Sequence, residues 1–206
     1  MLIVFGNQKG GAGKTTLATL FANQLTLIKK REVIVLDMDY QKSLVSSYEK
    51  SKALENPELY EVIGADLEQF PALFEVLSSK ENQDKIIIID LPGKIDDDHL
   101  LPIMRNTDIF VVPFTYDEKT YEATMLFTLL AHHLKPDAKK FFIPNRIKAN
   151  VKYTIKESCD TQLSEYGYVT DSISDRIDFQ RVTTKDIPAS LLDTLEKSFE
   201  PINKLI

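Results

Sequence analysis

The sequence predicts an α/β protein with a doubly wound, mostly parallel β-sheet flanked by helices. Short, β-branched apolar runs alternate with longer amphipathic stretches along the chain. Nearly every position of these runs is apolar, which is typical of strands that are covered on both faces. A glycine-rich loop also stands between the first run and the first helical stretch. In such folds ligands bind at the carboxyl ends of the strands, so the functional residues are expected there.

The elements follow in order along the chain. Strands are expected at 2–5, 32–37, 85–90, 108–113 and 139–144, with further candidate strands at 58–64 and 168–173. Helices are expected near 14–30, 66–79, 97–106, 117–134, 150–165 and 189–199. The sequence contains no internal repeat or low-complexity linker, so residues 1–206 are expected to form a single domain.

Composition narrows the classes of function. The chain of 206 residues carries a net charge of −6, so any binding to nucleic acid must come from a local patch. Its one cysteine, Cys159, excludes an internal disulfide and a cysteine-held metal cluster. No stretch reaches about 18 consecutive apolar residues, which argues against a membrane span. A cytoplasmic location is therefore expected.

The loop GNQKGGAGKTT, residues 6–16, has the composition of a phosphate-binding loop. Its glycines let backbone N–H groups converge on phosphate oxygens, and the following helix directs its positive end at the same charge. Lys14 can reach the outer phosphates, and the Thr15 hydroxyl can bind Mg²⁺. The residues predicted to bind the nucleotide here are Gly10, Gly11, Ala12, Gly13, Lys14, Thr15 and Thr16.

Carboxylates follow two of the predicted strands. Asp90 ends the run KIIIID, where it can hold a water molecule of the Mg²⁺ shell. Asp37 and Asp39 lie at the end of the strand predicted at 32–37, two residues apart, and period-2 geometry points both to one side. One of them can support the metal and the other the attacking water. Alternatively, either aspartate caps a helix near 42–51.

The three motifs together resemble a known family. K-G-G-x-G-K-T-T, then D-x-D-x-Q and D-x-P-G, are similar to the motifs of the ParA/MinD deviant Walker ATPases from Leu2 to about Pro188. The direct start at the first strand and the segment SISDRIDFQ (172–180) resemble the short ParA partition ATPases such as ParF. Two positions depart from the family pattern: Tyr40 stands where proline is frequent, and Lys94 follows DLPG directly.

The resemblance implies an Mg²⁺-dependent ATPase that hydrolyses ATP to ADP and phosphate. It implies that Lys9 reaches the partner's phosphates in an ATP-held sandwich homodimer and that Asp39 positions the attacking water. It also implies that Asp90 and Thr15 bind the metal. With Asp39 assigned to the water, Asp37 is the aspartate of the pair that is expected to support the metal from its second coordination shell. Asn145, in FFIPNRI, matches a residue that reads adenine, although asparagine is also common in turns.

The resemblance further implies segregation of plasmid, chromosome or mobile-element DNA with a ParB-like partner that stimulates hydrolysis. Two alternatives stay open. One is a MinD-like positioning ATPase with a protein cargo, and the other is an ATP-gated binding module with negligible turnover.

Residues 138–156 form the one strongly basic stretch, with six basic residues and no acidic one. Lys148, Lys152 and Lys156 recur every four residues, so one helical face can contact DNA phosphates and associate the protein with the nucleoid. The alternative is a solvated helix surface. At the carboxyl end, acidic residues outnumber lysines, so we expect a helix packed on the sheet and no membrane partner.

Overall fold

The computed structural model describes residues 1–53, 57–94 and 96–206 and contains a seven-stranded sheet. The strand order is β3-β2-β4-β1-β5-β6-β7, and every pairing is parallel. The strands are β1 (Leu2–Phe5), β2 (Val33–Asp37), β3 (Glu61–Gly64), β4 (Ile86–Asp90), β5 (Ile109–Phe114), β6 (Lys139–Pro144) and β7 (Tyr168–Val169). The predicted doubly wound parallel sheet is confirmed, including both shorter candidate strands.

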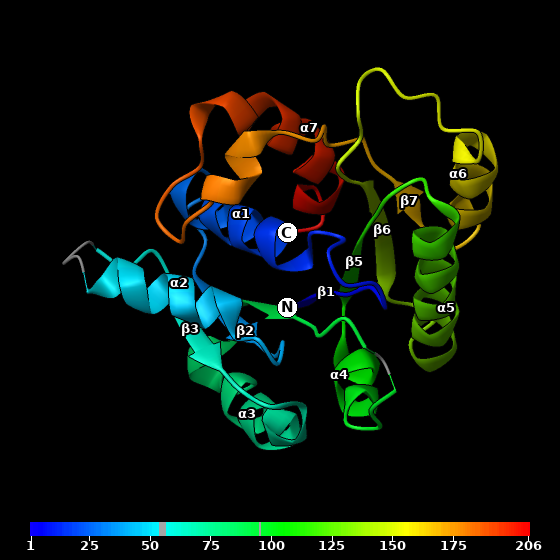
Figure 1. Cartoon of the computed structure of the whole chain (residues 1–206). Coiled ribbons are helices and arrows are strands. Elements are labelled where there is room, and N and C mark those ends of the chain that lie inside the picture. Colours follow the sequence, from blue (N-terminus) through cyan, green and yellow to red (C-terminus); the bar gives the residue numbers. More distant parts are fainter. Residues whose placement is uncertain (54–56, 95) are drawn as a thin grey trace.

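Seven α-helices flank this sheet in the described part of the chain (Figure 1). They are α1 (Lys14–Leu27), α2 (Ser43–Lys52), α3 (Phe70–Leu77), α4 (Leu100–Asn106), α5 (Glu118–Leu134), α6 (Lys156–Ser164) and α7 (Leu192–Asn203). Short 3₁₀ segments add η1 (Leu67–Gln69), η2 (Lys80–Asn82), η3 (Ile177–Arg181) and η4 (Ala189–Leu191). Helices α1, α2 and α7 contribute side chains to one core layer, and α3, α4, α5 and α6 contribute to the other.

The continuous apolarity of the strands reflects these two layers. In β4, Ile87 and Ile89 pack into the layer with α3 to α6, whereas Ile86 and Ile88 pack into the layer with α1, α2 and α7. Successive side chains of a strand point to opposite faces, so both sets must be apolar. The expected packing of the last helix on the sheet is confirmed, because Phe199 of α7 belongs to the same core cluster as Ile3 and Phe5 of β1. Its ring also meets the Phe21 ring of α1, with the centroids 4.9 Å apart.

The helix predicted at 150–165 is shorter than expected. Arg146 adopts a left-handed backbone conformation (φ 56°), and Ile147 then pairs with Ser174 in an isolated parallel bridge. The chain runs on as a loop, in which the Lys148 N–H donates to the Tyr153 hydroxyl, and α6 begins only at Lys156. The prediction that Lys148, Lys152 and Lys156 share one helical face is therefore wrong, because the first two lie on the loop.

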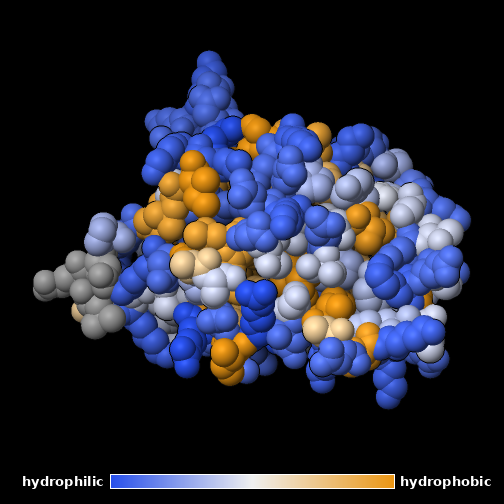
Figure 2. Space-filling view, turned by 90° about the horizontal axis from the view of Figure 1, so that it is seen from above, coloured by the Kyte–Doolittle hydropathy of each residue, from blue (hydrophilic) through white to orange (hydrophobic). Residues whose placement is uncertain are grey.

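The face seen from above in Figure 2 is largely hydrophilic, and its hydrophobic side chains form separate clusters. Among the helices that the structure describes, none is both long enough and apolar enough to cross a bilayer.

Candidate functional site

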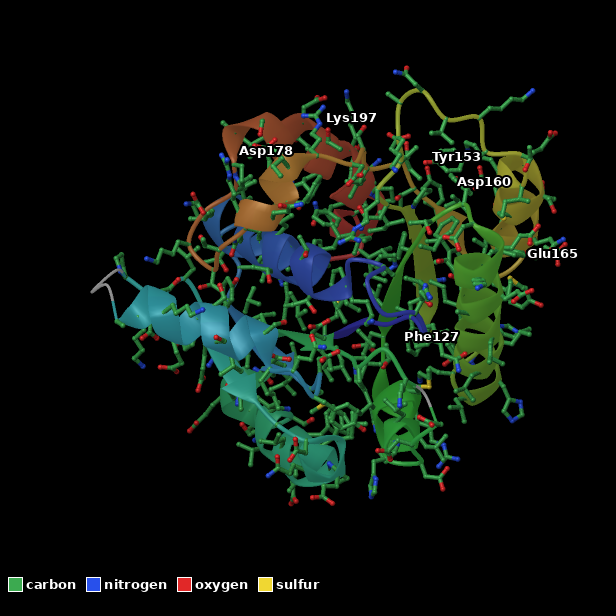
Figure 3. The ribbon with its side chains drawn as sticks, in the orientation of Figure 1. Phe127, Tyr153, Asp160, Glu165, Asp178 and Lys197 are labelled. Carbon is green, nitrogen blue, oxygen red and sulfur yellow. The ribbon has the colours of Figure 1, made fainter. Side chains whose placement is uncertain are left out.

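The loop between β1 and α1 is anchored by a buried asparagine. The Asn7 side chain is 0% exposed, and its amide donates to the Pro113 carbonyl and to Thr124 Oγ1, both at 2.8 Å. Its Oδ1 accepts the Lys9 N–H at 3.2 Å, so one side chain ties the loop to β5 and α5. Phe127 of α5 (Figure 3) packs where a side chain at Gly6 would otherwise stand. Sequence reasoning missed Asn7, because nothing within the motif marks its distant partners.

Two glycines of the loop have backbone conformations that disfavour side chains. Gly11 has φ 78°, and Gly13, directly before α1, has φ 98°. A Cβ atom on Gly13 would lie only 2.2 Å from Asn145 Nδ2. That amide donates to the Ala12 carbonyl at 2.8 Å, and Asn145 is 4% exposed. Asn145 therefore braces the loop from below, at the carboxyl end of β6.

Lys14 and Thr15 open α1 and face a buried carboxylate. The Thr15 hydroxyl donates to Asp90 Oδ2 at 2.5 Å, and Asp90, at the end of β4, is 0% exposed. Burial raises the pKa of Asp90, and the hydrogen bond from Thr15 and the charge of Lys14 oppose this shift. Burial lowers the pKa of the Lys14 ammonium, against the attraction of Asp90 and Asp39.

One carboxylate oxygen of Asp90 has the surroundings expected at the predicted magnesium site. Among the described residues, Oδ1 of Asp90 is buried and has no hydrogen-bond partner. Such an oxygen is costly to bury unless something donates to it. A water molecule of a Mg²⁺ shell supplies that donor, and the Thr15 hydroxyl beside it is a suitable metal ligand. Thr15 and Asp90 therefore fit the predicted magnesium site.

The two aspartates at the end of β2, Asp37 and Asp39, have different surroundings. Asp37 is 0% exposed, and its Oδ2 accepts the Leu44 and Val45 N–H groups at 3.0 Å each, at the first turn of α2. It thus caps α2, as one of the two alternatives proposed. The strand ends at Asp37, so period-2 geometry does not extend to Asp39, and that both point to one side stays a prediction. The metal role of Asp37 also stays a prediction.

Asp39 instead lines a cavity of about 530 Å³ above the loop. The other lining residues are Gly10, Gly11, Gly13, Lys14, Thr15, Thr16, Tyr40, Gln41, Ser43, Gly93, Lys94 and Arg146. A second cavity of about 260 Å³ adjoins it and shares Gly13, Thr16 and Arg146. Its other lining residues are Asn145, Asp175, Arg176, Phe179 and Gln180. Asp39, Asn145 and the predicted loop residues other than Lys9 and Ala12 therefore converge on two adjoining cavities.

Lys9 is placed differently from Lys14. The Lys14 side chain is 6% exposed and lines the first cavity, and its ammonium donates to the Lys9 carbonyl at 3.3 Å. Lys9 is exposed and lies outside the lining of both cavities. The two lysines of the loop are therefore presented to different surroundings.

A family model for the CobQ/CobB/MinD/ParA nucleotide-binding domain matches residues 3–189. The chain therefore belongs to this family. A search among curated proteins finds no match.

Solved structures of ParA/MinD-type proteins share the fold. A plasmid partition protein of Borrelia burgdorferi, bound to AMPPNP, has a TM-score of 0.79 at 20% identity and covers 100% of this chain and 99% of its own. A Pyrococcus furiosus MinD cell-division ATPase has a TM-score of 0.74 at 17% identity, with 100% and 99% covered. A Cyanothece McdA variant in complex with ATP has a TM-score of 0.68 at 19% identity, with 98% and 95% covered.

Lys156, the third lysine predicted to contact DNA, forms contacts with other side chains of the same chain. The Lys156 ammonium pairs with Asp160, lies 3.2 Å from the Tyr116 hydroxyl and stands 4.9 Å above the Tyr116 ring. Tyr116 in turn donates to Asp160 at 2.7 Å. The Tyr153 ring, labelled with Asp160 in Figure 3, also packs on Tyr116, with the ring centroids 5.6 Å apart. Lys148 and Lys152, by contrast, are exposed on the preceding loop.

Proposed function

We propose that this chain is an Mg²⁺-dependent ATPase of the ParA type, whose residues 1–206 act as one domain and form a sandwich dimer around ATP. The observation that carries the proposal is the placement of the two loop lysines. Lys14 lines the first cavity of its own chain, where it would bind that chain's nucleotide. Lys9 is exposed on the surface, where it can contact the phosphates bound by a second chain. A positive charge brought in by the partner stabilises the charge that develops on the phosphates and makes the dimer depend on ATP.

The site residues have distinct parts in this proposal. The backbone N–H groups of the loop, the start of α1 and Lys14 hold the phosphates. Thr15 and Asp90 would hold Mg²⁺, Asp90 through water, and the ion would supply positive charge against the phosphates. Asp39, on the rim of the first cavity, orients the attacking water. ATP is the substrate, and ADP and phosphate are the products.

The second cavity is the proposed place of the adenosine. It adjoins the first cavity at Gly13, so a nucleotide with its phosphates on the loop extends directly into it. Asn145 lies on its wall, and one hydrogen of its amide is donated to the Ala12 carbonyl. We therefore assign the brace to that hydrogen, and base contact to Asn145 Oδ1 and the second amide hydrogen.

We further propose that the ATP-held dimer drives partition of plasmid, chromosome or mobile-element DNA, with hydrolysis stimulated by a ParB-like partner. Family membership and the Borrelia partition-protein fold support this choice. Non-specific DNA contact is assigned to Lys148 and Lys152, which are exposed on their loop. Lys156 contributes less, because Asp160 already neutralises it.

Analytical ultracentrifugation with ATP, with ADP and without nucleotide tests the proposal. The ATP sample should sediment as a dimer and the other two as monomers, and only the dimer should co-sediment with DNA. A monomer at saturating ATP would contradict the sandwich dimer. Dimerisation without DNA binding would favour the MinD-like alternative with a protein cargo. A dimer whose turnover stays negligible even with its partner would favour the ATP-gated binding module.

A further inference from the structure

Another cavity lies beside β3, the strand at one edge of the sheet, and away from the loop between β1 and α1. It has a volume of about 430 Å³, and its lining is mainly apolar. The lining residues are Ile63, Gly64, Ala65, Gln69, Ala72, Leu73 and Val76. We call this cavity the β3–α3 groove, because β3 forms one wall and α3 with η1 forms the other.

Helix α3 is apolar on two sides. Phe70 and Leu77 are buried in the core, whereas Ala72, Leu73 and Val76 line the groove at helical spacing. Val76 is 64% exposed. In the described part of the chain, β3 pairs only with β2, so its other side is a free sheet edge. An apolar cavity beside a free edge is typical of a docking surface.

The surroundings of the groove are acidic. Residues 58–84 contain seven acidic residues and one lysine. Glu68 and Glu75 are seven positions apart, so they flank the same side of the apolar face, and both are exposed. Two more acidic residues are exposed at the opposite wall: Glu61 is the first residue of β3, and Asp66 lies two residues after the end of that strand. An apolar floor with an acidic rim complements a segment that is apolar on one face and basic on the other.

We propose that the β3–α3 groove binds a basic amphipathic segment of a partner protein. Apolar side chains of the segment enter the groove against Leu73 and Val76, and its Lys or Arg side chains meet Glu68 and Glu75. A second copy of this acidic chain is a poorer occupant, since like charges on the two copies repel each other.

The groove also touches contacts that hold the loop after β2. The Lys42 ammonium donates to the carbonyls of Asp37 and Ala65 and pairs with Asp66 at 3.4 Å. Ala65 lines the groove, and Lys42 closes the turn that begins at Asp39. A basic segment that competes for Asp66 therefore acts next to the loop that carries Asp39. An effect of the bound segment on ATP turnover rests on the proposed ATPase function, whereas the binding of the segment to the groove does not.

The probe is a fluorescein-labelled peptide of about 14 residues with leucine and lysine at helical spacing. Fluorescence anisotropy measures its affinity for the full chain. Val76→Glu, which places a charge on the apolar floor, and the double variant Glu68→Lys/Glu75→Lys should each weaken binding by about tenfold or more. Val76→Ser, a milder change, should weaken it less.

The matched control is Glu196→Lys/Glu200→Lys on α7, which changes the net charge by the same amount at two other exposed sites. It should alter the affinity by less than about threefold. Equal loss in this control, or no loss in Val76→Glu, would overturn the proposal, and so would a parent chain that does not bind the peptide. Self-association of the chain that Val76→Glu abolishes would assign the groove to a second copy instead.

ATP binding separates this proposal from the proposed function. Val76→Glu should bind ATP as the parent does, because Val76 lies outside both cavities over the loop. Loss of peptide binding with normal ATP binding therefore supports the groove alone. Absence of ATP binding in the parent would contradict the ATPase and leave the peptide result unaffected.

Discussion

Replacement of Gly13 by alanine tests the brace between the loop and β6. At φ 98°, a residue with a Cβ atom costs about 1–2 kcal/mol more than glycine. The new Cβ would also lie 2.2 Å from Asn145 Nδ2, so the Asn145 side chain must move. Its 2.8 Å hydrogen bond to the Ala12 carbonyl is then lost inside the protein, which costs about 1–3 kcal/mol. We expect Gly13→Ala to lower the free energy of unfolding by about 2–5 kcal/mol.

Urea denaturation of the nucleotide-free protein measures this effect. Gly10→Ala is the matched control in the same loop, because a Cβ at Gly10 meets nothing within 4 Å and Gly10 has no positive φ. It should change stability by less than about 1 kcal/mol, in the stabilising direction. The double variant Gly13→Ala/Asn145→Ala isolates the steric part. We expect the two changes to couple by about 1–2 kcal/mol, since the colliding amide is then absent. A stable Gly13→Ala protein, or additive changes, would refute the brace.

Three further predictions concern Asp90, Asp39 and the basic loop. The folded-state pKa of Asp90, about 7, exceeds the value of about 4 in an unfolded chain, so the nucleotide-free protein should lose stability as pH rises between these values. Asp90→Asn should remove this loss in urea titrations at about pH 5 and pH 8 while it weakens Mg-ATP binding; an unchanged pH dependence would contradict the assignment. Asp39→Ala should bind ATP in calorimetry like the parent but lose turnover, and full turnover would exclude its water-positioning role. Lys148→Glu/Lys152→Glu should lower DNA affinity and flatten its dependence on salt, with a smaller effect for Lys156→Glu; an unchanged salt slope would move the DNA surface elsewhere.

The elements that the sequence predicts well are those with a local physical cause. Strands such as Ile86–Asp90 are buried on both faces, so their apolarity alone predicts them. The loop at 6–16 and the start of α1 also follow from local glycine and lysine spacing. Six of the predicted loop residues, Gly10, Gly11, Gly13, Lys14, Thr15 and Thr16, accordingly line one cavity.

Contacts between distant segments explain what the sequence did not predict. Arg146 turns the backbone into the left-handed region, and the pairing of Ile147 with Ser174 keeps residues 147–155 out of a helix, although the lysine spacing is helical. Asn7 and the walls of the second cavity depend on partners that lie far along the chain. Asp37 has the spacing of a functional carboxylate, but its neighbours at the start of α2 make it a cap.

The central claim is that Lys9 acts on the phosphates of the partner chain. The most direct measurement is light scattering on Lys9→Ala/Asp39→Ala at saturating ATP, with Asp39→Ala alone as the control that prevents turnover. Lys14 and the loop remain intact in both variants, so both should bind ATP in calorimetry. We predict a dimer for Asp39→Ala and a monomer for the double variant. A stable ATP-bound dimer of the double variant would contradict the role of Lys9 across the dimer.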